Sequence, residues 1–212
     1  MNIAAAVEIG HLAHEAPSSA AEGGHAPKEI IVGYGFWIFL LSDIVMFAAL
    51  FAAYAVLVHA TAGGPVGDQL FSQLTVAIET ACLLASSYTC GLMSLAVGAR
   101  RRGAFYLTAM ITFALGAAFL ALEVSEFAEM IERGATPQRS AFLSAFFALV
   151  GCHGLHVGVG LVWLAVMVAQ VAVKSFRPSV VRRLQCFSLF WHALDIIWVA
   201  LFSVVYLMGV RP

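Results

Sequence analysis

Residues Phe142 to Trp163 read FLSAFFALVGCHGLHVGVGLVW, which is apolar enough for lipid yet contains two histidines and four glycines. On a helix that turns about 100° per residue, three of the glycines share one side: Gly151, Gly154 and Gly158. The histidines and the fourth glycine fall roughly opposite: His153, His156 and Gly160. A Gly-x-x-x-Gly spacing lets another helix backbone approach closely, and histidines are costly against lipid. Both sides of this helix are therefore predicted to face protein.

The composition excludes an ordinary soluble domain. Of the 212 residues, 62% are hydrophobic and only 11% are charged, and the mean hydropathy is +0.93. These values predict an all-α polytopic membrane protein. No run of basic residues indicates nucleic acid as a partner. The four cysteines lie within or beside apolar runs, without a Cys-x-x-Cys pattern, and we interpret them as reduced packing residues: Cys82, Cys90, Cys152 and Cys186.

Five hydrophobic runs are long enough to cross about 30 Å of hydrocarbon. They cover residues 35–58, 71–97, 105–125, 140–173 and 186–208. We therefore expect a transmembrane domain of five helices over residues 30–212. Residues 1–29 have no basic region ahead of an apolar core, so they are not typical of a cleaved secretory signal. We interpret them as a flexible cytoplasmic tail.

The basic residues between these runs predict the orientation. The connections ARRRG at 99–103 and KSFRPSVVRR at 174–183 are rich in arginine and lysine, whereas TAGGPVGD at 61–68 and ERGATPQR at 132–139 hold only two arginines. Cytoplasmic connections carry an excess of Lys and Arg. This rule puts the N-terminus in the cytoplasm and the C-terminus on the periplasmic side.

Ionisable side chains within the runs are the candidate functional residues, because each costs roughly 2.5 to 3.5 kcal/mol near the bilayer centre. They are Asp43, Glu79, Glu123, Glu126, His153, His156, His192 and Asp195. Their approximate depths give an inner layer of Asp43, His192 and Asp195 and an outer layer of Glu79, Glu123 and His153. Because His192 and Asp195 are three residues apart on one helix, they could satisfy each other.

Haem or metal ligation by the histidines is the first hypothesis to test. At about 1.5 Å per residue, His153 lies about 6 Å outward and His192 about 7 Å inward of mid-bilayer, too far apart for one iron or metal ion. His153 and His156 could bind a metal only with ligands from other helices, and neither is part of a His-x-x-x-His or Glu-x-x-His pattern. We favour hydrogen bonding between helices over ligation.

A proton or ion path is the second hypothesis. Its alternative is a polar seam that docks the helices to one another or to a partner subunit. An apolar gap separates the two layers, and neither a broken helix nor an internal repeat suggests a transporter. We favour the seam.

Several motifs together carry a resemblance to a known family. GCHGLHVGVGLVW is followed by SLFWHALDIIWVALFSVVYLMG, and both are preceded by FWIFLLSDIVMFAALFAAYAVL, TAGGP and SAFFALVG. The combination resembles subunit III of the haem-copper oxidases, in collinear order from about Lys28 to Val210. Within that superfamily the chain is most similar to the five-span branch found in bacterial cytochrome bo-type ubiquinol oxidases.

The resemblance implies an accessory subunit without catalytic, cofactor-binding or metal-binding residues of its own. Haem and copper would belong to a catalytic subunit I, with ubiquinol as the substrate of the complex and oxygen reduced to water. The other expected partners are subunit II, a small subunit IV and membrane phospholipids, in the bacterial inner membrane. By the same resemblance, Asp43 stands where many members have glutamate, and Glu123 with Glu126 match paired acidic residues.

Three other readings stay open at this point. A related five-span protein associated with nitric oxide reductase shares the fold and parts of the motifs, and cytochrome c oxidase subunit III is a further relative, which usually has seven spans. A small self-sufficient transporter would be a different class of protein.

Overall fold

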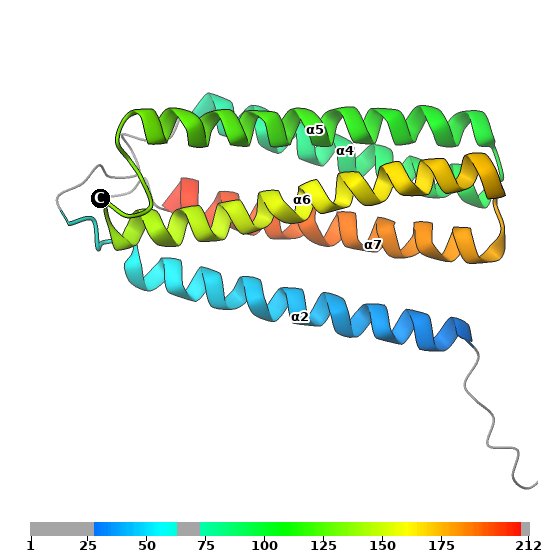
Figure 1. Ribbon diagram of the computed structural model, residues 1–212, viewed down its shortest axis with the longest axis horizontal. Helices are drawn as coiled ribbons and strands as arrows, with labels where there is room; N and C mark the ends of the chain where they lie inside the picture. Colours follow the sequence, from blue (N-terminus) through cyan, green and yellow to red (C-terminus); the bar gives the residue numbers. More distant parts are fainter. Residues whose placement is uncertain (1–27, 63–72, 209–212) are drawn as a thin grey trace, which may run out of the picture. The chain divides into compact units, whose positions relative to one another are not determined.

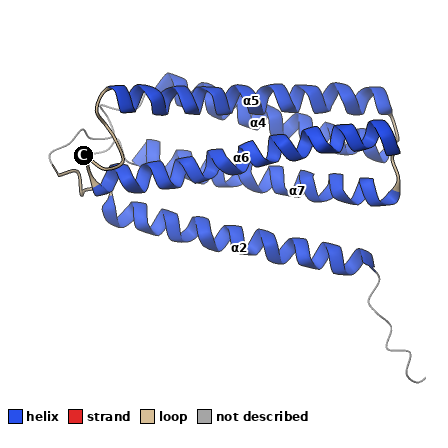
Figure 2. Cartoon of the chain, viewed as in Figure 1, coloured by secondary structure: helices blue, strands red, loops and turns tan. Residues whose placement is uncertain are grey.

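The computed structural model describes residues 28–62 and 73–208 of the chain, and all regular structure in these ranges is helical (Figures 1 and 2). Five helices are long and apolar enough to cross a membrane: α2 (Lys28–Leu57), α4 (Gln73–Gly98), α5 (Arg102–Glu132), α6 (Ala141–Lys174) and α7 (Pro178–Leu201), which continues as a π-helix, η1 (Phe202–Met208). The prediction of five apolar helices is thus confirmed. Most of the predicted tail and of the TAGGPVGD connection lies outside the described residues.

Some helices are longer than the apolar runs from which they were predicted. α5 continues past residue 125 to Glu132, because glutamate, alanine and methionine are good helix formers even where they are too polar for a lipid-crossing window. It ends where Gly134 adopts a left-handed φ of 78°, a common way to terminate a helix. α7 begins at Pro178, eight residues before the apolar run, since proline is favoured in the first turn of a helix.

Two compact units divide the chain, Met1–Gly35 and Phe36–Pro212, and the packing described here is that of the second. In it α4, α5, α6 and α7 lie side by side (Figure 1). α4 packs on α5, α5 on α6, α6 on α7, and α7 back on α4. Short connections at residues 99–101, 133–140 and 175–177 join successive helices. This closed ring is the arrangement of a four-helix bundle with short connections.

Large aromatic side chains fill the bundle where small residues make room for them. Trp191 of α7 is 1% exposed. A β-carbon on Gly116 of α5 would lie 2.9 Å from one Trp191 ring carbon, and a β-carbon on Gly160 of α6 would lie 2.8 Å from another. The indole is therefore held between two helices that can approach it only because both positions are glycine.

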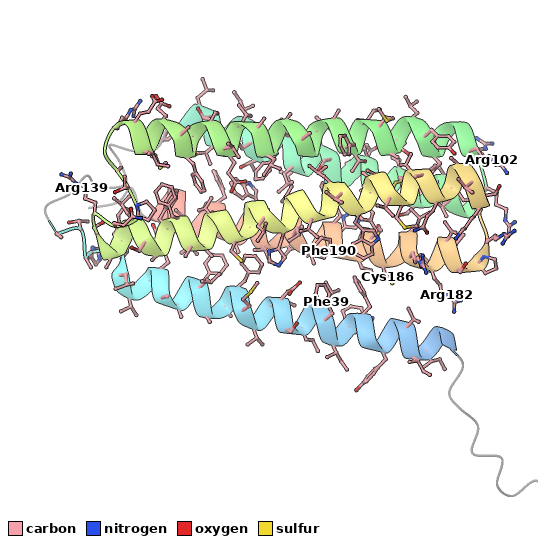
Figure 3. All side chains as sticks on the ribbon, viewed as in Figure 1. Phe39, Arg102, Arg139, Arg182, Cys186 and Phe190 are labelled. Atoms are coloured by element: carbon pink, nitrogen blue, oxygen red, sulfur yellow. The ribbon has the colours of Figure 1, made fainter. Side chains whose placement is uncertain are left out.

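From Phe36 onward, α2 contacts the bundle through a line of aromatic rings. Phe39 faces Phe190 of α7 with ring centroids 6.3 Å apart, and the two side chains point toward each other (Figure 3). Tyr54 lies beside Phe142 of α6, with centroids 6.0 Å apart. Much of the remaining α2 surface is exposed; Val45, for example, is 69% exposed. This surface suits lipid or a partner helix.

Candidate functional site

Three glutamates from two helices come together inside the bundle. Glu79 on α4 and Glu123 and Glu126 on α5 are 0%, 3% and 8% exposed, respectively. Each carboxyl group lies within electrostatic range of the other two. Both carboxyl oxygens of Glu79 and of Glu123, and one of Glu126, have no hydrogen-bond partner among the described residues. Unpaired buried carboxylates are costly, and like charges nearby add to the cost, so this acidic cluster needs a donor or a proton.

His153 lies in an aromatic cage. It is 0% exposed, and its ring centroid is 5.2 Å from that of Trp198, 5.8 Å from Phe119 and 6.4 Å from Phe47. Neither ring nitrogen hydrogen bonds to any described residue. This differs from our expectation of an interhelical hydrogen bond, because the neighbouring helices present ring faces and edges where a polar partner would be needed. Four helices (α2, α5, α6 and α7) thus meet at one imidazole.

The glycine side of α6 faces α5. A groove of about 550 Å³ runs along it, lined by Gly151, Gly154 and Gly158 and by residues of both helices that include Glu123. A β-carbon on Gly154 would lie 2.7 Å from both carboxyl oxygens of Glu123, whereas one on Gly158 would come no closer than 3.7 Å to Leu120. Gly154 therefore makes the room that the Glu123 carboxyl group occupies.

His156 and Asp43 link α6 to α2. The His156 Nδ1 lies 2.7 Å from the carbonyl oxygen of Cys152 in its own helix, which satisfies that nitrogen locally. Its ring centroid is 5.3 Å from that of Phe47. Asp43, which is partly buried, lies within electrostatic range of His156. The two ionisable groups are thus neighbours across the α2–α6 contact, a pairing that the sequence did not predict.

His192 makes an interhelical hydrogen bond. Its Nδ1 lies 2.7 Å from the hydroxyl oxygen of Ser87 on α4. Asp195 is within electrostatic range of His192 and beside the same serine, although its Oδ1 has no hydrogen-bond partner among the described residues. The structure therefore places His192 and Asp195 together, with Ser87 as the third member of the group.

A row of hydroxyl groups on α4 pairs with α7 along the length of the contact. The Trp198 and Trp191 indole nitrogens each donate at 3.1 Å, to Thr80 and Ser86 respectively, and Ser94 donates to Ser188 at 3.0 Å. We call these groups, with Ser87 and His192, the α4–α7 seam. This contact has the character of the polar seam between helices that we favoured over a proton or ion path.

Most of this seam was not predicted from the sequence. Of its members, only His192 was among the candidate residues; the hydroxyl residues Thr80, Ser86, Ser87 and Ser94 were not. Serine and threonine are inexpensive in membrane helices because they can bond to their own backbone, so they did not stand out. The signal that could have found them is the pair of tryptophans, because a buried indole N–H usually finds an acceptor.

Residues assigned to one predicted depth layer do not all lie next to one another. Of the outer layer, Glu79 and Glu123 come together, but His153 makes ring contacts instead of joining them. Of the inner layer, His192 and Asp195 come together, whereas Asp43 lies near His156. Within residues 28–62 and 73–208, no three His, Cys, Asp or Glu side chains are grouped so that they could hold a metal ion.

Comparisons with known proteins agree with the motifs. The family described as cytochrome c oxidase subunit III matches residues 14–210. The chain is 47% identical over 208 residues to cytochrome bo(3) ubiquinol oxidase subunit 3 of Pseudomonas aeruginosa, which covers 98% of this chain and 95% of that protein. It is 48% identical to the protein of the same name from Pseudomonas putida, over 83% of this chain and 85% of the relative. Quinol oxidase subunit 3 of Bacillus subtilis is 43% identical, over 82% of this chain and 86% of the relative. The chain belongs to the cytochrome c oxidase subunit III family.

Proposed function

We propose that this chain is the third subunit of a bacterial quinol oxidase of the cytochrome bo(3) type, located in the inner membrane. The observation that carries the proposal is the 47% identity over 98% of the chain to a ubiquinol oxidase subunit 3. Relatives from Pseudomonas and Bacillus both bear quinol oxidase names. The description of the family itself names cytochrome c oxidase, and that branch is the second candidate.

In this role the chain is accessory and holds no haem or copper; electron transfer and oxygen reduction take place in the catalytic subunit I. The surroundings of its histidines support this. Rings surround His153, His156 bonds to its own helix, and His192 bonds to a serine. Each of these three histidines is engaged separately, so they act as local packing and polar contacts.

The partners of the chain would be subunits I and II and a small subunit IV, with phospholipid around the remaining surface. The exposed apolar side chains of α2 and the groove beside α6 offer surfaces for such contacts. We place the N-terminus in the cytoplasm and the C-terminus in the periplasm. Support comes from the two basic connections, whose residues Arg100, Arg102, Lys174 and Arg177 line one hollow at a single end of the bundle.

Co-purification tests the proposal. A tagged copy of the chain, extracted in mild detergent, should bring with it a complex that contains low-spin haem b and a haem-copper centre and that oxidises ubiquinol with consumption of oxygen. Oxidation of cytochrome c instead of ubiquinol would indicate the second candidate. A partner with haem and non-haem iron would indicate nitric oxide reductase, and a single functional chain would indicate a transporter.

A further inference from the structure

Four basic side chains line one hollow at the end of the bundle where the α4–α5 and α6–α7 connections meet. They are Arg100, Arg102, Lys174 and Arg177. The hollow has a volume of about 490 Å³, and its other lining residues are Val173, Ser175 and Phe176, so no acidic side chain of the described residues lines it. Figure 3 shows Arg102 at this end and Arg139 at the opposite one. The hollow is therefore a concentrated positive site, where an anion would be attracted from several directions.

The two connections are joined to each other at this point. The Arg102 guanidinium donates a hydrogen bond of 2.7 Å to the Ser175 hydroxyl, across 73 residues of sequence. Arg100 and Ser175 both have left-handed backbones, with φ of 53° and 58°, a conformation that is uncommon for residues other than glycine. Sharp turns in both connections thus bring cations from separate parts of the chain around one space.

Backbone donors are also available here. α5 begins at Arg102, which lines the hollow, and has no side-chain hydrogen bond at its N-cap. α7 begins at Pro178, which has no N–H, and its Val180 N–H already bonds to the Arg177 carbonyl. The first N–H groups of a helix lack partners within it and bind anions readily. The C-terminal ends of α4 and α6 also lie at this surface, but carbonyl groups there already accept hydrogen bonds. The Arg101 N–H donates to the Ala96 carbonyl and the Ser175 N–H to the Val171 carbonyl.

The wall of the hollow is apolar on one side. Val173 is 83% exposed, whereas Phe176 is 7% exposed, so a hydrophobic surface lies beside the charges. The hollow adjoins the ends of α4 and α6, where a spanning helix leaves the hydrocarbon. Free phosphate would use the cations but not the apolar wall. A phospholipid would use both, with its phosphate in the hollow and its chains along the helices.

We propose that this hollow binds the phosphate of an anionic phospholipid in one leaflet of the membrane. The phosphate oxygens would accept hydrogen bonds from Arg100, Arg102 and Arg177 and from Lys174, and Val173 would contact the start of an acyl chain. Basic hollows between helices at a membrane surface suit such headgroups. This inference does not depend on which oxidase the chain serves.

Native mass spectrometry of the complex purified through this chain tests the proposal. The sample is stripped of lipid and offered an equal mixture of phosphatidylglycerol and phosphatidylcholine. The unaltered complex should retain phosphatidylglycerol preferentially. An Arg102→Gln, Lys174→Gln double variant should lose that preference, with retention falling roughly fivefold for each charge removed.

Two controls make the result specific. Arg139→Gln removes a cation at the far end and should leave the preference unchanged. Arg102→Lys keeps the charge but loses the guanidinium and should retain most of the binding. If the double variant retains phosphatidylglycerol like the unaltered complex, or if inorganic phosphate displaces the lipid, the proposal is overturned. Ubiquinol oxidation by the same samples reports the proposed function separately, so the two can fail independently.

Discussion

The carboxyl group of Glu123 lies against the backbone of Gly154, so close that a β-carbon on this glycine would be 2.7 Å from both carboxyl oxygens. The two residues come from neighbouring helices, α5 and α6, and the glutamate is 3% exposed. A glycine in a helix interior is ordinarily a weakness. Here it is what allows the acidic cluster to be buried at a close contact between helices.

Gly154→Ala should therefore destabilise the chain, because the added methyl group must displace the Glu123 carboxyl group. Overpacking of this kind typically costs about 1–3 kcal/mol. The matched control is Gly158→Ala on the same face, where the nearest atom would be 3.7 Å away. The midpoint of thermal unfolding in detergent should fall for the first variant and not for the second. Equal midpoints would contradict this account of the glycine face.

A double variant separates the contact from general effects on the helix. If the clash with Glu123 is the cause, shortening that side chain in Glu123→Ala should recover part of the loss produced by Gly154→Ala. The two substitutions should thus be non-additive, as expected for residues in contact. Strict additivity would place the cause elsewhere.

Gly160→Ala tests the room made for Trp191. The new β-carbon would lie 2.8 Å from a carbon of the buried indole ring, which cannot shift without disturbing Gly116 on its other side. We expect the free energy of unfolding to fall by about 1–3 kcal/mol, which should appear as lower recovery of folded protein. Gly91→Ala is the control, because nothing lies within 4 Å of that position; it should be neutral or slightly stabilising.

The hydrogen bond between Ser87 and His192 should make a modest contribution to the stability of the folded chain. Ser87→Ala removes the only hydrogen-bond partner of the imidazole among the described residues, at a cost of roughly 0.5–1.5 kcal/mol of stability. Ser125→Ala is the comparison, since the Ser125 hydroxyl donates to the carbonyl of Leu122 in its own helix and makes no interhelical hydrogen bond among the described residues. If both variants unfold at the same temperature, the seam contributes nothing at this position.

Asp43→Asn should preserve both assembly and turnover of the complex. Asparagine can still donate and accept hydrogen bonds beside His156, so a purely structural role would survive the change. The measurements are the recovery of the complex, its rate of ubiquinol oxidation and the protons released per electron in vesicles. A fully assembled variant with a lower proton yield would assign Asp43 to proton uptake instead.

Much of the fold follows from the sequence, whereas little of the side-chain pairing does. The five apolar runs predict the five helices because length and hydropathy are properties of single segments. The motifs around His153 and His192 likewise predicted the family, and the family is confirmed. Helix ends were less well predicted: Glu132 and Pro178 lie beyond the apolar runs, where helix propensity and capping decide.

The depths of the polar groups were misleading as a guide to their partners. Asp43 and His192 were predicted to lie at similar depths, yet Asp43 lies beside His156 and His192 beside Ser87. Depth depends only on position along a helix, but pairing depends also on how each helix is rotated and which helix it meets. Those quantities are set by packing, such as the fit of Trp191 between two glycines, and no single run of sequence contains them.

The contacts of α2 have a consequence for the order in which the protein is made. Phe47 emerges from the ribosome early, but its ring partners His153 and His156 follow about a hundred residues later. At bacterial rates of synthesis this delay is roughly 5 to 20 seconds. During that interval the second and third helices, α4 and α5, can begin to associate with each other, before α2 can form its ring contacts with α6. The many exposed apolar side chains of α2 are compatible with lipid during this delay, so α2 would join the bundle only after α4 and α5 have met.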